Sequence, residues 1–260
     1  MDRYRDYINE NIAYWTKRAP GYSEVNREEL RTLQRQVWLR VLDNRIQQAL
    51  AGRNRSDIHI LDVGTGPGFF AIILSDLGYC VTAVDYTGAM LEQAQRNAGH
   101  LAEKIRFLQM DAEALSFPDG SFDVVVSRNL TWNLSKPERA YAHWVRVLKE
   151  GGLLLNFDAN WYRYLYDAQA ETGHHFDREN VRNVGAADDT AGTDVAAMEM
   201  IARQAPLSRC SRPEWDLDIL LRLGMQVSAD TKIWEQVWTW DEWVNNASTP
   251  MFLITASRIA

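Results

Sequence analysis

Residues 60–70 read ILDVGTGPGFF, and this stretch decides the fold class. The apolar residues that flank Asp62 predict a buried strand. The closely spaced glycines that follow, Gly64, Gly66 and Gly68, predict a sharp turn into a helix. Glycine permits a positive φ and lets a ligand approach the main chain where a Cβ would collide. The stretch therefore predicts a strand, a ligand-binding turn and a helix in direct succession.

The spacing of these glycines separates two kinds of nucleotide site. A dinucleotide fingerprint has a third glycine, or an alanine, at position 69, where the helix packs on the strand beside a pyrophosphate. This chain has Phe69 there, and its Gly-x-Gly-x-Gly spacing after an acidic strand residue is typical of a ligand without pyrophosphate. An NAD-dependent oxidoreductase is therefore disfavoured, and no Tyr/Lys catalytic pair lies nearby.

Outward from residues 60–70, apolar runs alternate with helix-like segments. The runs that predict strands are IHILDV (58–63), CVTAVD (80–85), IRFLQMD (105–111), SFDVVVSRN (121–129), LLLNFD (153–158), MQVSAD (225–230) and PMFLITASRI (250–259). Near-continuous apolar strands of this kind are covered by helices on both faces, which predicts an α/β fold with a doubly wound, mostly parallel sheet.

Two segments lie outside this alternation. Residues 1–52 carry apolar positions at helical spacing among many charges, which predicts an N-terminal helical cap. Residues 159–213 mix aromatic, polar and small residues, and a segment of this length inside a compact domain is usually a lid or binding insertion. We therefore expect a Rossmann-like domain formed by 53–158 and 214–260, with 159–213 as a substrate cap.

Polar residues follow several of the predicted strands. Asp85 ends its strand 21 positions after Gly64, where a carboxylate can accept both ribose hydroxyls. Asp111 is followed by the small Ala112, so it can accept from an adenine amine without crowding the ring. Residues 127–129, Ser-Arg-Asn, end the next strand. Open α/β sheets bind ligands at the carboxyl ends of parallel strands, so we expect these residues at one site.

The motifs LDVGTGPGFF, AVDYTGAML, FLQMDAEALSFPDGSFDVVVSRN and VLKEGGLLL occur in that order. Together they resemble the class I S-adenosylmethionine (SAM)-dependent methyltransferases, especially the broad small-molecule group that includes the ubiquinone and menaquinone biosynthesis type. The resemblance covers roughly residues 56–158. It implies a seven-stranded sheet of order 3-2-1-4-5-7-6 with an antiparallel last strand, SAM as cofactor and S-adenosylhomocysteine as product.

The resemblance also implies roles for individual residues. The amino-acid part of the cofactor would be met by Asp62, Gly64, Thr65 and Gly66, with Gly68 completing the turn, and its methionine would face Ser127 and Asn129. Asp85 would hold the ribose. The adenine would be flanked by Tyr86 and Met90, and its edge would be contacted by Asp111 and Ala112. The N-terminal stretch YWTKRAPGY would place Tyr14, Trp15 and Tyr22 over the cofactor, with Arg18 near its carboxylate.

The acceptor side is less defined. Methyl transfer from a sulfonium needs alignment and exclusion of water, and a base helps if the acceptor is a hydroxyl or thiol. Asp158, which ends the fifth strand, is the predicted base, and Trp132, Asn160 and Trp161 are predicted to contact the acceptor. We expect His174 and His175 in a solvated loop and predict no metal site, because adjacent histidines alone do not define a zinc geometry.

Composition narrows the partners. The formal net charge of −7 argues against nucleic acid, whose binding depends on clustered Lys and Arg, and residues 128–132, RNLTW, lack an Asn-Pro-Pro-Tyr-like tetrad. The charged N-terminus and the lack of a long apolar run predict a cytoplasmic protein without a membrane anchor. We expect methyl transfer to a small molecule; a non-catalytic SAM-binding or regulatory protein, or a protein methyltransferase, are the alternatives. The acceptor atom, the pathway and the oligomeric state are not predicted.

Overall fold

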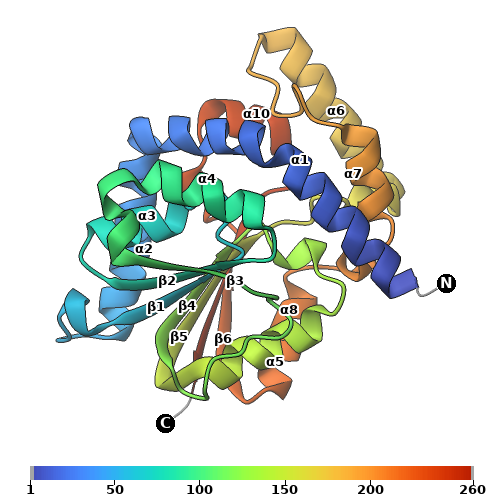
Figure 1. Ribbon diagram of the computed structural model, residues 1–260. Helices are drawn as coiled ribbons and strands as arrows, with labels where there is room; N and C mark the ends of the chain where they lie inside the picture. The colour runs from blue at the N-terminus through green and yellow to red at the C-terminus, as the bar shows by residue number, and fades with distance from the viewer. Residues whose placement is uncertain (1–2, 259–260) are drawn as a thin grey trace.

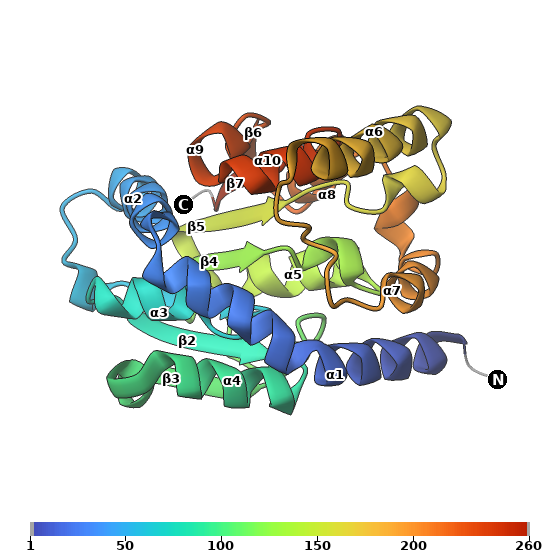
Figure 2. The same cartoon turned by 90° about the horizontal axis from the view of Figure 1, so that it is seen from above.

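The computed structural model describes residues 3–258, which form a central sheet between two layers of helices (Figures 1 and 2). The strands are β1 (His59–Val63), β2 (Cys80–Asp85), β3 (Ile105–Gln109), β4 (Phe122–Arg128), β5 (Leu148–Asp158), β6 (Met225–Asp230) and β7 (Phe252–Arg258). Their order in the sheet is β3-β2-β1-β4-β5-β7-β6, and β7 pairs antiparallel with both of its neighbours. The predicted fold class, strand order and antiparallel last strand are confirmed.

The alternation of apolar side chains along the strands explains the two helical layers. In β1, Ile60 packs in the core below one face, whereas Leu61 and Val63 pack in the core below the other. The first core contains buried residues of α2 (Leu33–Ala49) and α3 (Phe69–Asp76), and the second those of α5 (Pro137–Val147) and α8 (Glu214–Arg222). A strand covered on both faces needs an apolar residue at nearly every position, as the sequence has.

Helices α1 (Arg3–Arg31) and α4 (Gly88–Ala98) pack on each other, and α1 runs across the strand ends on the side where β1, β2 and β4 terminate (Figures 1 and 2). Two short helices that the apolar pattern does not predict, α9 (Trp234–Val237) and α10 (Trp240–Asn246), lie between β6 and β7. Thr239 begins α10 with a capping box in which Glu242 bonds back to the main chain of Thr239.

The segment 159–213 is largely helical. It contains the turns η4 (Arg163–Leu165) and η5 (Pro206–Arg209), the helix α6 (Ala168–Val184), which packs on α10, and α7 (Val195–Ala202), which packs on α1. The expected solvated loop around His174 and His175 is wrong, because both lie within α6. Asp167 caps this helix, which buries only Asp177 and Val181, so it leaves little apolar periodicity in the sequence. The division into cap, domain and insertion stays a prediction.

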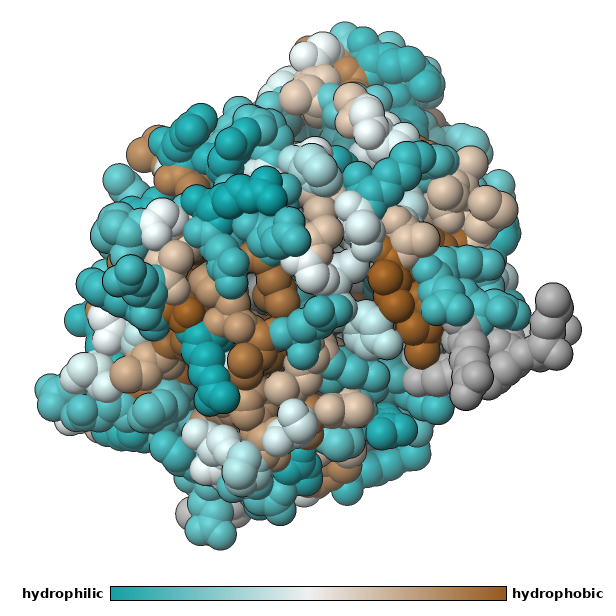
Figure 3. Space-filling view, viewed as in Figure 1, coloured by the Kyte–Doolittle hydropathy of each residue, from teal (hydrophilic) through white to brown (hydrophobic). Residues whose placement is uncertain are grey.

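The surface in Figure 3 is mostly hydrophilic, with apolar side chains gathered in small groups. No helix among residues 3–258 is long and apolar enough to cross a membrane. Cys80 and Cys210 are both free thiols.

Candidate functional site

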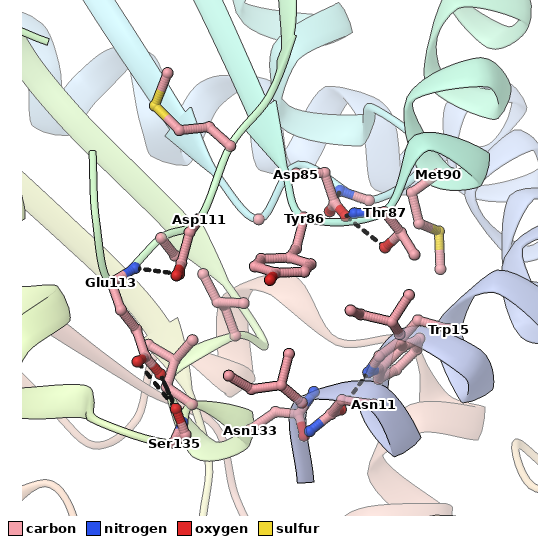
Figure 4. A pocket seen from close by; sticks show the side chains of 18 of the residues that line it. Asn11, Trp15, Asp85, Tyr86, Thr87, Met90, Asp111, Glu113, Asn133 and Ser135 are labelled. Carbon is pink, nitrogen blue, oxygen red and sulfur yellow. Dashed lines mark hydrogen bonds between the residues drawn. The ribbon is translucent and has the colours of Figure 1, made fainter. Parts of the chain in front are cut away.

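A cavity lies where β1, β2, β3 and β4 end, and helix α1 forms its other wall (Figures 1 and 4). Ten of the residues predicted to bind a cofactor line it: Trp15, Tyr22, Gly64, Gly66, Asp85, Tyr86, Met90, Asp111, Ala112 and Asn129. The lining also includes residues that were not predicted: Tyr7, Ile8, Asn11, Ile12, Thr87, Met110, Glu113, Arg128, Leu130, Asn133, Leu134 and Ser135. The structure therefore brings together residues from the ends of four strands and from the N-terminal helix.

The glycine turn forms the floor of this cavity. Gly64 and Gly66 have φ values of +69° and +53°, which side chains rarely adopt. A Cβ on Gly64 would lie 2.6 Å from the Leu130 side chain, so glycine is required where the loop after β4 crosses the turn. Gly68 has a different role from the one expected: its Cβ would lie 3.0 Å from that of Ala94, so it allows close packing of α3 and α4 rather than lining the cavity.

Asp85 ends β2 with its carboxylate on the cavity wall. One oxygen accepts from the Gly66 N–H at 2.9 Å, and the other accepts from the N–H and the hydroxyl of Thr87 at 2.9 and 2.8 Å. Burial raises the pKa of Asp85, while these hydrogen bonds favour its ionised form. The carboxylate is therefore held in one orientation by the glycine turn and by the start of α4.

Asp62, Thr65 and Ser127 lie behind the cavity wall. One oxygen of the Asp62 carboxylate accepts from the Thr65 hydroxyl at 2.6 Å and from the Ala71 N–H at 3.0 Å. Burial raises the pKa of Asp62 to about 7. The Ser127 hydroxyl donates to the Val63 carbonyl at 3.0 Å. All three side chains therefore shape the glycine turn from behind, and none of them is among the lining residues.

Asp111 and Glu113 form the wall at the end of β3. The Glu113 N–H donates to the Asp111 carboxylate at 2.8 Å, and burial raises the pKa of Asp111. The Glu113 carboxylate, which is buried, accepts from the N–H of Ser135 at 2.7 Å and from the N–H of Lys136 at 2.8 Å. Glu113 thus connects the loop after β3 to the loop after β4. The sequence carries no signal for it, because its partners lie more than twenty positions away.

Arg128 and Asn129 end β4. The Arg128 guanidinium pairs with Glu29 of α1 at 2.5 Å and lies over the ring of Trp38, with 4.8 Å between its carbon and the ring centroid. Asn129 has a positive φ of 55°, and its Oδ1 is buried without a hydrogen-bond partner. A buried polar atom without a partner costs free energy, so this oxygen is suited to a ligand donor in the cavity.

Helix α1 contributes one face to the cavity. Tyr7, Asn11 and Trp15 follow one another at i, i+4 spacing, and the Trp15 indole N–H donates to Asn11 Oδ1 at 3.2 Å. That spacing is the signal by which Tyr7 and Asn11 could have been predicted. Tyr14 and Arg18 do not line the cavity: Tyr14 packs edge-on against Trp15, and the Arg18 guanidinium lies 6.0 Å from the centroid of the Tyr22 ring.

The structure does not support Asp158 as a base. Its carboxylate is fully buried, does not line the cavity and pairs with the Arg212 guanidinium at 2.9 Å. Its two oxygens also accept hydrogen bonds from four further groups in the loops after β4 and β5. These donors are the Thr131 hydroxyl, the N–H groups of Trp132 and Ala159, and the Trp161 indole. With every lone pair engaged, Asp158 is a structural anion between these loops.

The residues predicted to contact the acceptor belong to the same loops and do not line the cavity. The Trp132 indole N–H donates to the Asn129 carbonyl at 3.0 Å, and Asn160 bonds to the main chain of Arg212. Trp161 donates to Asp158. They support the cavity wall from outside it. Across residues 3–258, no three His, Cys, Asp or Glu side chains group in a way that could hold a metal ion.

The sequence of this chain matches known proteins in the region that forms the cavity. Residues 61–156 match the family model of the methyltransferase domain. Residues 61–156 therefore form a methyltransferase domain. The match contains the glycine turn, Asp85, Asp111 and Asn129, so the predicted resemblance is confirmed for this part of the chain.

Relatives of this methyltransferase domain differ in their acceptors. The chain is 37% identical over 131 residues to a malonyl-[acyl-carrier protein] O-methyltransferase of Paenibacillus, covering 48% of each chain. It is 40% identical over 98 residues to a demethylmenaquinone methyltransferase of Thermus thermophilus, covering 37% of this chain and 44% of that protein. The chain thus spans about half the length of the curated relatives it matches, and the names of these relatives do not agree on a substrate.

Solved structures show the same fold over most of the chain. The YcgJ protein of Bacillus subtilis superposes with a TM-score of 0.55 at 20% identity, covering 84% of this chain and 98% of that one. A Haemonchus contortus phosphoethanolamine N-methyltransferase, solved with S-adenosylhomocysteine, superposes with a TM-score of 0.54 at 16% identity, covering 84% and 53%. The methyltransferase fold therefore extends beyond residues 61–156.

Proposed function

We propose that this protein transfers a methyl group from SAM to a small-molecule acceptor. The observation that carries the proposal is the convergence of the glycine turn, Asp85 and Asp111 on one cavity at the carboxyl ends of β1, β2 and β3. The methyltransferase domain and the names of its relatives support the same activity.

The cavity fits the cofactor in three places. The oriented Asp85 carboxylate would accept the ribose hydroxyls, and Asp111 would accept from the adenine amine with Ala112 leaving room for the ring. The unpartnered Oδ1 of Asn129 would accept from the ammonium of the amino-acid end, beside the main chain of Gly64 and Gly66. Arg128 and Glu29 are already paired there, so the site adds no unbalanced positive charge of its own.

The chain's own residues would act by positioning. When bound, the cofactor supplies an electrophilic methyl group on a positively charged sulfur, so the carbon–sulfur electron pair returns to sulfur as the acceptor lone pair forms the new bond. Among the described lining residues there is no His, Cys or Lys, and Asp85, Asp111 and Glu113 already accept hydrogen bonds. Burial raises the pKa values of Tyr7 and Tyr22, so both hydroxyls stay protonated. We infer that no protein base is used and that any proton on the acceptor leaves to water.

Calorimetric titration tests the first half of the proposal. We expect S-adenosylhomocysteine to bind with a Kd below about 1 mM, since even a few charge-assisted hydrogen bonds supply about 4 kcal/mol. Absence of binding would reject the proposed function. An acceptor screen that follows release of S-adenosylhomocysteine tests the second half. Binding without turnover on any acceptor would favour the alternative of a non-catalytic SAM-binding protein.

A further inference from the structure

The cavity has two chemically different sides, which Figure 4 shows around the ring of Tyr86. Asp85 and Thr87 lie on one side of the ring, at the end of β2. Asn11 of α1 and Asn133 of the loop after β4 lie on the opposite side. Asp85 and Asp111, which we propose bind the cofactor, lie on the first side and on the adjoining wall. The side with the two amides is therefore left for a second molecule.

The two amides are oriented by hydrogen bonds to their oxygens. Asn11 Oδ1 accepts from the Trp15 indole at 3.2 Å, and Asn133 Oδ1 accepts from the Tyr7 hydroxyl at 3.4 Å. The single hydrogen of the Tyr7 hydroxyl is shared with the main-chain carbonyl of Asn133 at 2.9 Å, and the Tyr7 oxygen is hydrogen-bonded by Asn11. Each amide nitrogen carries two hydrogens, so both side chains keep a donor for a ligand oxygen.

Around these amides the lining is apolar and offers no charge to an anion. The two elements that carry the amides also contribute Ile8, Ile12, Leu130 and Leu134 to the lining. Among the described lining residues only Arg128 is cationic, and its charge is already paired with Glu29. An anion would therefore be desolvated here without a free counter-ion from the protein, which is costly.

A cationic acceptor fits no better. A protonated amine has no lone pair for the methyl carbon, and the three carboxylates of the lining already accept hydrogen bonds within the protein. An uncharged molecule with an apolar body loses little on leaving water, and one oxygen on it can accept from the amides.

We propose that this side of the cavity selects an uncharged, largely apolar acceptor that presents a carbonyl or hydroxyl oxygen to the amides of Asn11 and Asn133. The inference rests on the proposed function, since it assumes that the cofactor fills the side with Asp85. It ranks carboxylate, phosphate and ammonium acceptors below uncharged ones. Asn11 and Asn133 are then specificity-determining residues that act by binding.

Three probes of one shape test the selection by charge. The full chain is saturated with S-adenosylhomocysteine, whose neutral sulfur adds no charge, and is titrated with 2-naphthol, 2-naphthoate and 2-naphthylmethylammonium. We expect the Kd of 2-naphthol to be at least about ten-fold lower than those of both ions, because neither ion finds a free counter-charge. Equal or tighter binding of either ion overturns the inference. Failure of S-adenosylhomocysteine itself to bind instead overturns the proposed function, so the two failures are distinguishable.

Replacement of Asn133 tests the contact. In Asn133→Leu the Tyr7 hydroxyl keeps its bond to the main-chain carbonyl, so the wall is preserved while the amide is lost. We expect 2-naphthol to bind about three- to ten-fold more weakly, the loss of one neutral hydrogen bond, with the affinity for S-adenosylhomocysteine retained. The matched control is Asn180→Leu on the exposed face of α6, which should change neither. Unchanged binding of 2-naphthol in Asn133→Leu contradicts the inference, and if that variant does not fold, the three-probe comparison on the natural chain still decides it.

Discussion

Two aspartates in this protein end parallel strands, yet they do different things. Asp85 ends β2 and turns its carboxylate to the cavity, held by donors from Gly66 and Thr87 close to it in the sequence. Asp158 ends β5 and binds the guanidinium of Arg212, which lies 54 positions further along the chain. Both aspartates lie at a strand end, so the groups that bind each carboxylate determine whether it faces the cavity or is buried in an ion pair.

The partner of Asp158 belongs to a fully buried network. Arg212 also pairs with Asp216 of α8 at 2.7 Å, and Asp216 accepts from the Tyr141 hydroxyl at 2.6 Å. The Arg212 guanidinium also donates a hydrogen bond to the Thr131 hydroxyl oxygen at 2.7 Å. Two carboxylates and one guanidinium without water are stable only when their hydrogen bonds are made. The network therefore holds the loop that carries Leu130 and Asn133 against the cavity.

The largest expected effect is on this network. Arg212→Met would leave two buried carboxylates without their cation, and we expect a loss of about 3–5 kcal/mol in the free energy of unfolding. Urea unfolding followed by circular dichroism measures it. Arg222→Met is the control, because Arg222 also pairs with an aspartate four residues away, Asp218 of α8, but is exposed, and its loss should cost less than about 1 kcal/mol. Equal stability of the two variants would mean that the buried ion pairs of Arg212 contribute no more to the free energy of unfolding than an exposed ion pair does.

The next largest effect is on cofactor binding. Asp85→Ala would remove a carboxylate that accepts two ribose hydroxyls, so we expect affinity for S-adenosylhomocysteine to fall by about 1.5–3 kcal/mol, or about 10- to 150-fold. Calorimetric titration measures the change. Asp230→Ala is the control: Asp230 also ends a strand, β6, but pairs with Arg45 of α2. An unchanged Kd for the Asp85 variant would remove this carboxylate from the cofactor site.

A third effect is a pH dependence of stability that starts from Asp62. Its pKa is raised by burial to about 7 in the folded chain, against 3.8 ordinarily, so between these values the folded state keeps a proton that the unfolded state has lost. Stability should therefore fall as the pH rises toward 7, by at most about 1.4 kcal/mol per pH unit, and level off above it. The Asp62→Asn variant lacks this slope, so its stability relative to the natural chain should increase from about pH 5 to 7. A constant difference would show that Asp62 is ionised throughout.

The fold was predictable because its signals are local. Each strand from β1 to β5 is an apolar run next to its own turn, and the glycine turn and Asp85 belong to consecutive elements. The same locality explains why Tyr86, Met90 and Ala112 line the same cavity as Asp85. Burial on both faces makes such strands conspicuous in one sequence.

The remaining part of the site depends on contacts between distant segments. Asn133 is held by Tyr7, 126 positions away, and Asp158 by Arg212, so no local pattern distinguishes the first as a lining residue or the second as a buried ion pair. Trp132 and Asn160 were expected at the acceptor, but Trp132 donates to the Asn129 carbonyl and Asn160 donates to the Arg212 carbonyl. Which way a loop residue points is set by partners that the sequence does not place.

The smallest effect on cofactor affinity is expected at Asp111, which extends the comparison between carboxylates at the ends of strands. Asp111→Asn keeps an oxygen for the Glu113 N–H but presents a donor to the adenine amine, so one hydrogen bond would be lost. Because Asp111 would lose one hydrogen bond whereas Asp85 would lose two, we expect a loss of about 0.5–1.5 kcal/mol, or about two- to ten-fold in the Kd of S-adenosylhomocysteine. Asp119→Asn, an exposed residue before β4, is the control. If Asp111→Asn weakened binding as much as Asp85→Ala, the adenine end would hold the cofactor as firmly as the ribose, and the number of hydrogen bonds that a carboxylate accepts would not set the strength of the contact.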